Sequence, residues 1–301
     1  MNLADGIRAV LIKEAGAAQV AIELVDGGYS GSVAGVAATS TDSFFFKAVG
    51  VDSLPANDYR TEARVARAIA SRVPSPRLRF EEVADGWIVL GFDVAPGIMP
   101  AEPWSRRQLN AVLSMLDDLT GVLTPSPVAG LPSLADRMRG RSTTWALLEG
   151  SGHRDALTVG DLTKWEQQNL HQLAELERRS DALLVGETLL HFDLRHDNLT
   201  VDDNGAICIL DWGRACTGPA WADVVCLLLE SDAGMNDLNR AFLGTARGAA
   251  ADPVAVDSFL AILASYWRHA ATMTKGVPGD LQQRRSASAD WTIKWLRHRL
   301  N

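Results

Sequence analysis

The sequence predicts an α+β protein of two lobes: a small antiparallel β lobe with one helix, followed by a larger, mostly α-helical lobe. The first third of the chain consists of short apolar runs that end at Gly, Pro or polar clusters, which is typical of strands. After Gly97 the apolar residues recur at helical spacing over long segments. We expect the division near residue 94, with lobes of residues 1–94 and 95–301.

The first lobe is expected to be an antiparallel meander that contains one helix. The expected elements are strands over 19–28, 32–41 and 43–51, a helix over 57–76, and a hairpin over 77–97. Asn57 or Asp58 can cap the start of the helix, and Pro74 closes it. The hairpin is expected to turn at Asp85-Gly86, a dipeptide that favours tight turns.

The second lobe is expected to be almost entirely helical. Candidate helices cover residues 104–123 and 158–184 and three segments after residue 219. One strand pair interrupts them, around the turn Asn204-Gly205. A β-rich lobe joined to a helical lobe suggests a cleft, and clefts of this kind are frequent ligand sites.

Composition excludes several classes of protein. The chain has 301 residues, 47% of them hydrophobic, enough for a sizeable core. Its formal net charge is −8, whereas nucleic-acid-binding proteins usually carry a basic excess, so we expect no nucleic-acid partner. No apolar run reaches the roughly 18 residues of a membrane helix, and the N-terminus lacks a signal-peptide pattern. Cys208, Cys216 and Cys226 show no metal-ligand spacing, so we expect a reduced, cytoplasmic protein.

The stretch from His191 to Asp211 gathers the residues that can carry chemistry. Asp193 lies before a turn, Asn198 follows five positions later, and Asp211 comes directly after a buried-looking strand. Amide and carboxylate oxygens suit Mg²⁺, which takes few protein ligands and keeps its other positions for water and phosphate. We expect Asn198 and Asp211 to bind the metal, which leaves Asp193 to accept a proton from a substrate hydroxyl. The alternative is that the three residues only cap turns.

The segment "HFDLRHDN", followed by a hairpin and "ILDWGRA", resembles the protein-kinase-like fold and, more closely, the aminoglycoside phosphotransferase family of small-molecule kinases. The resemblance implies that Asp193 is the catalytic base and that Asn198 and Asp211 hold the metal. It covers about residues 20–230. The metal-binding Asp is followed by Trp-Gly, where most protein kinases have Phe-Gly.

Lys47 and Glu62 are expected to complete the phosphate site. Lys47 lies in "SFFFKAVGV", with apolar neighbours on both sides, which is unusual for a solvated lysine. Glu62 shares the inward stripe of its helix with Val65 and Ile69, and no basic residue three or four positions on can pair with it. Its expected partner is Lys47, and the resemblance implies the same pair. The alternatives are a lysine that guards a sheet edge and a glutamate bonded to backbone.

Two backbone segments are expected to contact the nucleotide. The glycine-rich turn with Gly28, Ser30 and Gly31 could bring N–H groups to phosphates, although a plain hairpin turn would look similar. The resemblance implies that backbone groups between the lobes bind the adenine edge, at Gly91, Phe92 and Asp93. The chain has no P-loop motif.

Three further residues are expected to support Asp193. His191 is expected to bond to backbone and hold the loop. Arg195 either steadies the Asp193 carboxylate or a phosphate, or it is a solvated loop arginine. Asp223 either favours the positive end of the following helix or, as the resemblance implies, bonds back to the catalytic loop.

The expected function is a Mg²⁺-dependent kinase that transfers the γ-phosphoryl group of ATP or GTP to a hydroxyl of an aminoglycoside-like antibiotic, and so confers antibiotic resistance. The alternative is a metabolic kinase for a sugar, a choline-like compound or an amino-acid alcohol. A pseudokinase is disfavoured because the site residues are intact, and a protein kinase because no Ala-Pro-Glu follows Asp211. The acids Glu230, Asp232 and Asp237 would suit a cationic acceptor, or they are solvated.

Overall fold

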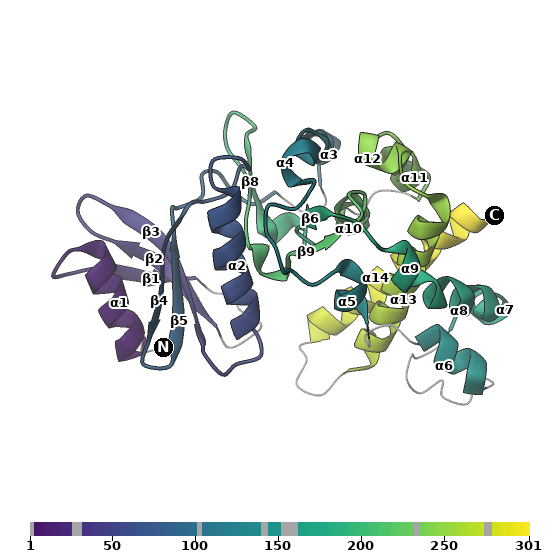
Figure 1. Ribbon diagram of the computed structural model, residues 1–301, viewed down its shortest axis with the longest axis horizontal. Coiled ribbons are helices and arrows are strands. Elements are labelled where there is room, and N and C mark those ends of the chain that lie inside the picture. Colours follow the sequence, from purple (N-terminus) through teal and green to yellow (C-terminus); the bar gives the residue numbers. More distant parts are fainter. Residues whose placement is uncertain are drawn as a thin grey trace. The chain divides into compact units, whose positions relative to one another are not determined.

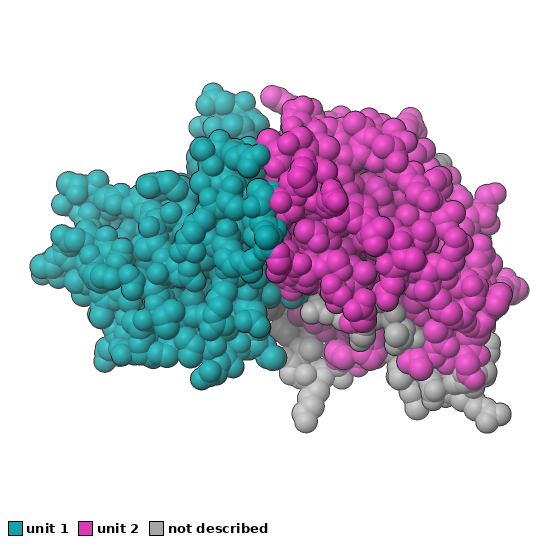
Figure 2. Space-filling model, in the orientation of Figure 1, with its two compact units in different colours: residues 1–101, 127–129, 196–215 teal, residues 102–126, 130–195, 216–301 magenta. Residues whose placement is uncertain are grey.

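The structure is a computed structural model that describes residues 3–25, 32–100, 104–139, 144–151, 162–231, 235–273 and 279–301. The chain forms two compact units, each made of segments that are distant in the sequence (Figure 2). Unit 1 consists of residues 1–101, 127–129 and 196–215, and unit 2 of residues 102–126, 130–195 and 216–301. The lobe boundary at residue 94 stays a prediction.

Unit 1 is built around a five-stranded antiparallel sheet with the strand order β1-β2-β3-β5-β4 (Figure 1). Its strands are β1 (Ala21–Leu24), β2 (Val33–Ala38), β3 (Ser43–Gly50), β4 (Leu78–Ala84) and β5 (Trp87–Phe92). β4 and β5 form the predicted hairpin. Asp85 and Gly86 at its turn have φ angles of 47° and 80°, as a tight two-residue turn requires.

Helix α2 (Ala56–Ile69) packs on one face of this sheet. Its inward side chains recur at three- and four-residue spacing, and Tyr59 and Ala63 share a buried cluster with Leu90 of β5. The helix ends earlier than predicted. Ser71 has a φ of 61°, which is incompatible with a continuing right-handed helix.

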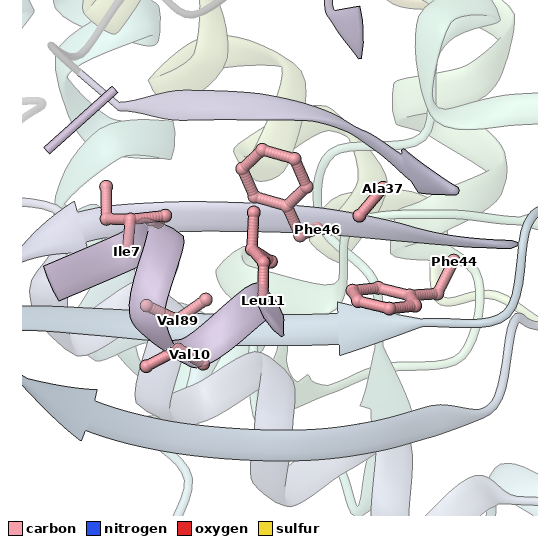
Figure 3. Packing of buried hydrophobic residues seen from close by; sticks show 8 residues of the cluster. Ile7, Val10, Leu11, Ala37, Phe44, Phe46 and Val89 are labelled. Atoms are coloured by element: carbon pink, nitrogen blue, oxygen red, sulfur yellow. The ribbon is translucent and has the colours of Figure 1, made fainter. Parts of the chain in front are cut away.

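Helix α1 (Asp5–Ala15) covers the opposite face of the sheet and corrects the prediction of a single helix in this lobe. Figure 3 shows Ile7, Val10 and Leu11 packed with Phe46 of β3 in one buried cluster. The three α1 residues occupy positions i, i+3 and i+4, so the short helix presents one apolar face to the sheet.

A hairpin from much later in the chain also belongs to unit 1. It consists of β7 (Leu199–Val201) and β8 (Ile207–Ile209). Gly205 at its turn has a φ of 82°, as the predicted turn requires. The backbones of Ile98 and Val201 form an antiparallel bridge, and the N–H of Ile209 donates to the carbonyl of Pro74. These bonds attach the hairpin to the N-terminal part of unit 1.

Unit 2 is mainly helical, as predicted. Its two longest described helices, α13 (Pro253–Thr272) and α14 (Gly279–Leu300), pack against each other, and Trp145 and Trp295 are completely buried in this unit. The other described helices are α3 (Arg106–Asp118), α4 (Thr120–Leu123), α5 (Leu134–Met138), α6 (Thr144–Ser151), α7 (Lys164–Gln168), α8 (Leu170–Arg178), α9 (Ser180–Leu183), α10 (Ala222–Glu230), α11 (Met235–Leu243) and α12 (Ala246–Ala249).

Unit 2 differs from the sequence prediction in two places. The helix predicted over 158–184 is three short helices, α7 to α9, and residues 158–161 lie outside the described part of the chain. A second strand pair, β6 (Thr188–Leu190) with β9 (Cys216–Gly218), was not predicted. Three-residue strands that are distant in the chain leave no periodic signal.

The antiparallel sheet of unit 1 and the helices of unit 2 confirm the predicted α+β class. No helix in the described ranges has both the length and the hydropathy that a membrane span needs. The three cysteines are free thiols, and Cys208 and Cys216 are buried.

We expect Leu11→Ala to destabilise unit 1, because Leu11 is completely buried between α1 and the sheet. Truncation of such a side chain removes roughly 2–5 kcal/mol from the free energy of unfolding. Urea denaturation of the full chain measures this change. The matched control is Ile12→Ala, where the side chain is 37% exposed and the change should stay below about 0.5 kcal/mol. Equal losses in the two variants would contradict the packing of α1.

Candidate active site

Lys47 lies in the central strand β3 and faces α2. Phe46 and Ala48 belong to the cluster under α1, whereas Val49 belongs to the cluster under α2. Alternate side chains of a strand point to opposite faces, so Lys47 shares the α2 face with Val49. Because β3 pairs with both β2 and β5, Lys47 does not guard a sheet edge.

Glu62 on α2 forms an ion pair with Lys47, the partner that the sequence indicates. Both side chains are nearly buried, with exposed fractions of 10% for Lys47 and 5% for Glu62. The ring centroid of Tyr59, three positions earlier on α2, lies 5.1 Å from the Lys47 Nζ atom, within the range of a cation–π contact. Removal of Lys47 would leave the Glu62 carboxylate buried without this cation, and removal of Glu62 would take away the more buried of the two carboxylates beside Lys47. The pair therefore fixes α2 on the sheet.

The environment of Lys47 keeps its ammonium group charged. Burial by itself lowers the pKa of Lys47, but the carboxylates of Glu62 and Asp211 outweigh this effect, and the pKa is raised. Burial raises the pKa of Glu62 to about 7, although the charge of Lys47 opposes that shift. The site therefore holds a permanent positive charge in a poorly solvated place, where it interacts strongly with anions.

Asn198 and Asp211 lie at the open end of the β7–β8 hairpin. Leu199 pairs with Ile209, and beyond this pair the N–H of Leu210 donates to the carbonyl of Asn198 at 2.9 Å. Asp211 follows directly in the chain. The register of the hairpin therefore brings an amide and a carboxylate to the same end, although the loop of the hairpin separates them in the sequence.

Asp211 has an unusual backbone conformation and lies beside Lys47. Its φ is 57°, a region that non-glycine residues rarely occupy and that is often found at functional sites. Its Oδ1 atom lies 3.2 Å from the Lys47 Nζ atom and accepts from the N–H of Gly213 at 3.4 Å. Its side chain is 51% exposed, so the carboxylate remains accessible to a further cation. Arg214 donates to Asp58 at 3.4 Å, which connects this turn to α2.

The side chains at the hairpin end fit a magnesium ion that shares its coordination with a ligand. Asn198 and Asp211 offer hard oxygen donors, and Mg²⁺ commonly takes one or two protein carboxylates and completes its shell with water and phosphate oxygens. Within the part of the chain that the structure describes, no group of three or more His, Cys, Asp and Glu side chains could form a complete cage. The donor chemistry therefore suits a metal bound together with a nucleotide.

The loop that carries Asp193 belongs to unit 2 and is held by Asp223. The N–H groups of His191 and Phe192 donate to the two oxygens of the Asp223 carboxylate, each at 2.8 Å. Phe192 has a φ of 62°. The Nδ1 atom of His191 accepts from the N–H of Asp193 at 3.2 Å. These bonds confirm that the His191 ring bonds to backbone and that Asp223 bonds back to the loop.

Asp193 is partly exposed and lies near Arg195. Their side chains are 37% and 34% exposed, and the Arg195 Nε atom lies 3.8 Å from the Asp193 Oδ1 atom. This distance is too long for a hydrogen bond but allows a charge interaction. Asp193 precedes Asn198 by five residues in the chain.

Gly91 and Phe92 lie inside β5, and Asp93 follows it. Because β3 and β4 flank β5, the backbone groups of Gly91 and Phe92 face these strands. The N–H of Asp93 donates to the carbonyl of Arg77 at 2.9 Å. A Cβ atom on Gly91 would lie 2.2 Å from the ring of Phe80, so the glycine makes room for this ring. The role of these backbone groups in adenine binding stays a prediction.

The sequence prediction missed a cluster of charged residues that holds the end of β5. The Asp93 carboxylate accepts from Arg79 Nε at 2.6 Å and from Arg77 Nε at 3.1 Å. Arg79 also donates to Asp42 at 2.6 Å. Arg77 and Arg79 stand two positions apart where β4 begins, and Asp93 follows its hairpin partner β5. This pattern is the signal that could have indicated the cluster.

The glycine-rich turn with Gly28, Ser30 and Gly31 lies outside the described residues, so its contact with phosphates stays a prediction. Among the acids considered for the acceptor, Asp232 lies outside them as well, and Glu230 lies at the end of α10. The described candidates thus form two groups. Lys47, Glu62, Asn198 and Asp211 belong to unit 1, and Asp193 belongs to unit 2.

Several solved structures resemble nearly the whole chain. Choline kinase LicA from Streptococcus pneumoniae matches with a TM-score of 0.65 and 14% identity over 97% of this chain and 98% of that chain. A thermostable mutant of aminoglycoside phosphotransferase APH(4)-Ia, in a ternary complex with ADP and hygromycin B, matches with a TM-score of 0.59 and 16% identity over 97% of each chain. A microcompartment-associated aminopropanol kinase matches with a TM-score of 0.63 and 15% identity, again over 97% of each chain. At these identities the likeness shows the fold alone, which is the protein-kinase-like fold that the sequence indicates.

No curated protein matches the chain in sequence. The model of the phosphotransferase enzyme family, in contrast, matches residues 21–259, most of the chain. The matched span contains the sheet, α2, the β7–β8 hairpin and the loop with Asp193. The chain therefore belongs to the phosphotransferase enzyme family, and it is a phosphotransferase with an alcohol group as acceptor.

Proposed function

We propose that this protein is a Mg²⁺-dependent small-molecule kinase that transfers the γ-phosphoryl group of ATP, or of GTP, to a hydroxyl of an aminoglycoside-like antibiotic or a related small molecule. The observation that supports it most strongly is the position of Lys47 between buried Glu62 and half-exposed Asp211. A fixed cation beside an accessible carboxylate suits phosphoryl transfer, because catalysis of this reaction rests on positioning and charge.

Lys47 is proposed to bind the phosphates of the nucleotide. Glu62 already holds the ammonium group in place, so little side-chain freedom is lost when a phosphate binds. The ADP in the related aminoglycoside phosphotransferase complex supports ATP as the donor, with GTP as the alternative. The glycine-rich turn around Gly28 would add N–H donors, and the backbone at the end of β5 would hold the base.

Asn198 and Asp211 would hold the magnesium ion. The ion, when bound, neutralises charge on the transferred phosphoryl group and the leaving group. The hydrogen bond from Gly213 and the contact with Lys47 restrict the direction of the Asp211 carboxylate. These contacts support the proposal that the side chains of unit 1 bind the ion together with the phosphates.

Asp193 is proposed to position the acceptor hydroxyl and to take its proton. The hydroxyl oxygen forms a bond to the γ-phosphorus, the bond from this phosphorus to the β–γ bridging oxygen breaks, and the nucleoside diphosphate leaves. The proton moves late to the Asp193 carboxylate, because a loose transition state demands little basicity. The bonds from His191 and Asp223 hold the loop so that this carboxylate keeps one position.

The acceptor is proposed to carry both a hydroxyl and a cationic nitrogen. Hygromycin B, choline and aminopropanol, the compounds in the names of the similar structures, share these two groups. The net charge of −8 favours a cationic partner over an anionic one. An antibiotic acceptor would make the protein a resistance enzyme, and a choline-like or amino-alcohol acceptor would give it a metabolic role. We propose the cytoplasm, where ATP is abundant, as the compartment for either role.

The decisive experiment is a substrate panel with MgATP and MgGTP as donors. Aminoglycosides, choline, amino alcohols and neutral sugars are compared by release of the nucleoside diphosphate and by mass spectrometry of the product. We expect a mass increase of one phosphoryl group on an acceptor that has both a hydroxyl and an amine. A protein that binds MgATP but phosphorylates none of these compounds would support the pseudokinase alternative.

Replacement of Asp193 by Asn should lower kcat by roughly 10²–10⁴-fold, because an amide cannot accept the hydroxyl proton. MgATP binding, followed by the shift of the melting temperature, should persist, because the proposed nucleotide residues belong to unit 1. The control is Asp203→Asn, an exposed residue in the turn of the β7–β8 hairpin. Full activity in Asp193→Asn would refute the role of this carboxylate.

Replacement of Asp211 by Ala should abolish the Mg²⁺-dependent part of nucleotide binding. A ligand at a hundredfold excess over its dissociation constant stabilises a folded protein by about 2.7 kcal/mol, and the variant should lose the share of this gain that requires Mg²⁺. Thermal melts with ATP, with and without Mg²⁺, measure the difference, each against the same variant without ligand. Asp203→Ala serves as the control. A shift that depends on Mg²⁺ as strongly as in the wild type would show that Asp211 does not bind the metal.

A further inference from the structure

The buried side chain of Arg247 connects several elements of unit 2. It belongs to the short helix α12 and is only 5% exposed. Its Nε atom donates to the Thr120 Oγ1 atom of α4 at 2.9 Å, and its Nη1 atom donates to the carbonyl of Ala220 at 3.2 Å. The residues that precede α10 are therefore attached to α4 and α12 (labelled in Figure 1) through one guanidinium group.

The backbone at Arg247 is fixed as well. Asp117, near the end of α3, accepts from the N–H groups of Ala246 at 2.9 Å and Arg247 at 3.3 Å. The hydroxyl of Thr245 accepts from the N–H of Gly248 at 2.9 Å and caps the same helix. A side chain attached to a doubly capped turn has little freedom to move. Arg247 can therefore act as a rigid point of attachment for the start of α10.

The backbone that Arg247 binds lies shortly before Asp223 in the chain. Asp223 is the second residue of α10, three positions after Ala220, and is only 2% exposed. A buried carboxylate is costly unless hydrogen bonds and positive charge compensate it. Burial lowers the pKa of the Arg247 guanidinium, and the charges of Asp223 and Asp117 oppose that shift. The bond from Arg247 to the Ala220 carbonyl therefore holds the backbone just before this buried carboxylate.

We propose that Arg247 is a positioning residue for the catalytic loop. It fixes the backbone at the start of α10, so that the Asp223 carboxylate keeps its hydrogen bonds from the N–H groups of His191 and Phe192. Those bonds in turn hold Asp193, one residue further on. The inference rests on the proposed function of Asp193 as the base, and Arg247 itself is not proposed to touch any substrate.

Hydrogen exchange in Arg247→Met tests the structural part of this inference. The amides of His191 and Phe192 should exchange roughly tenfold faster than in the wild type, because Asp223 no longer has a fixed position. The matched control is Arg299→Met. Arg299 is also largely buried, but it donates to Asp257 at 2.5 Å and to Asn239 at 3.0 Å, away from the start of α10. Its loss should leave the two amides at the wild-type rate.

Kinetics of the phosphotransfer reaction test the functional part. Arg247→Met should lower kcat roughly tenfold and leave KM for MgATP within about twofold, since Arg247 belongs to unit 2 and the proposed nucleotide residues to unit 1. Arg247→Lys, which keeps the charge, should recover part of the loss. In an Asp223→Asn background Arg247→Met should add little, because the two side chains act through the same bonds.

Wild-type exchange at His191 and Phe192 in Arg247→Met would overturn the inference, and so would a lower melting temperature with unchanged kcat. If Arg247→Met does not fold, the same exchange measurement on Thr120→Val tests the inference. This substitution removes the acceptor of the Arg247 Nε atom and should speed the same exchange about two- to threefold, and an unchanged rate would overturn the inference. If the wild type phosphorylates no hydroxyl compound, the proposed function fails, while the exchange experiment still decides the role of Arg247.

Discussion

The ion pair between Lys47 and Glu62 is the interaction on which unit 1 depends. An ammonium group in the central strand of a sheet carries a desolvation penalty of several kcal/mol, and two carboxylates offset it. Glu62 comes from α2, and Asp211 comes from the end of a hairpin more than a hundred residues later. One positive charge therefore joins the sheet, its helix and the hairpin. The buried charge of Lys47 must be balanced by Glu62 and Asp211. The same three residues therefore stabilise the fold of unit 1 and form part of the candidate site.

Much of this arrangement could be predicted from the sequence, because the relevant signals are local. Lys47 and Glu62 stand among apolar residues at the period of their own elements, so both had to point inward. The turns at Asp85-Gly86 and Asn204-Gly205 were visible because few residues adopt positive φ. Helix α1 was missed because it is short and its N-cap residue, Ala4, makes no capping bond. Its apolar residues could be interpreted as a packing face only once the sheet face that they cover was known.

The remaining features depend on partners that are distant in the sequence. From the sequence, Gly91 was expected only to offer backbone groups between the lobes, but the structure shows that it makes room for the ring of Phe80 on the neighbouring strand. Arg247 is one arginine among many in the sequence, and its partners Thr120 and Ala220 lie 127 and 27 positions earlier. No periodic pattern reports such contacts, because they arise only when helices pack. The protein-kinase-like fold and the supports His191 and Asp223 were predictable from the motif and its resemblance, whereas the contacts of Arg247 were not.

The membership of residues 196–215 in unit 1 also has a consequence for biosynthesis. The hairpin is translated about 100 residues after β5, which at roughly 5–20 residues per second is a delay of about 5–20 seconds. During this interval the Pro74 carbonyl and the backbone of Ile98 have not yet met their partners in the hairpin. The nascent N-terminal segment therefore exists first as an incomplete body that chaperones can bind. A gene fragment that stops before codon 199 lacks the whole hairpin and encodes only this immature form.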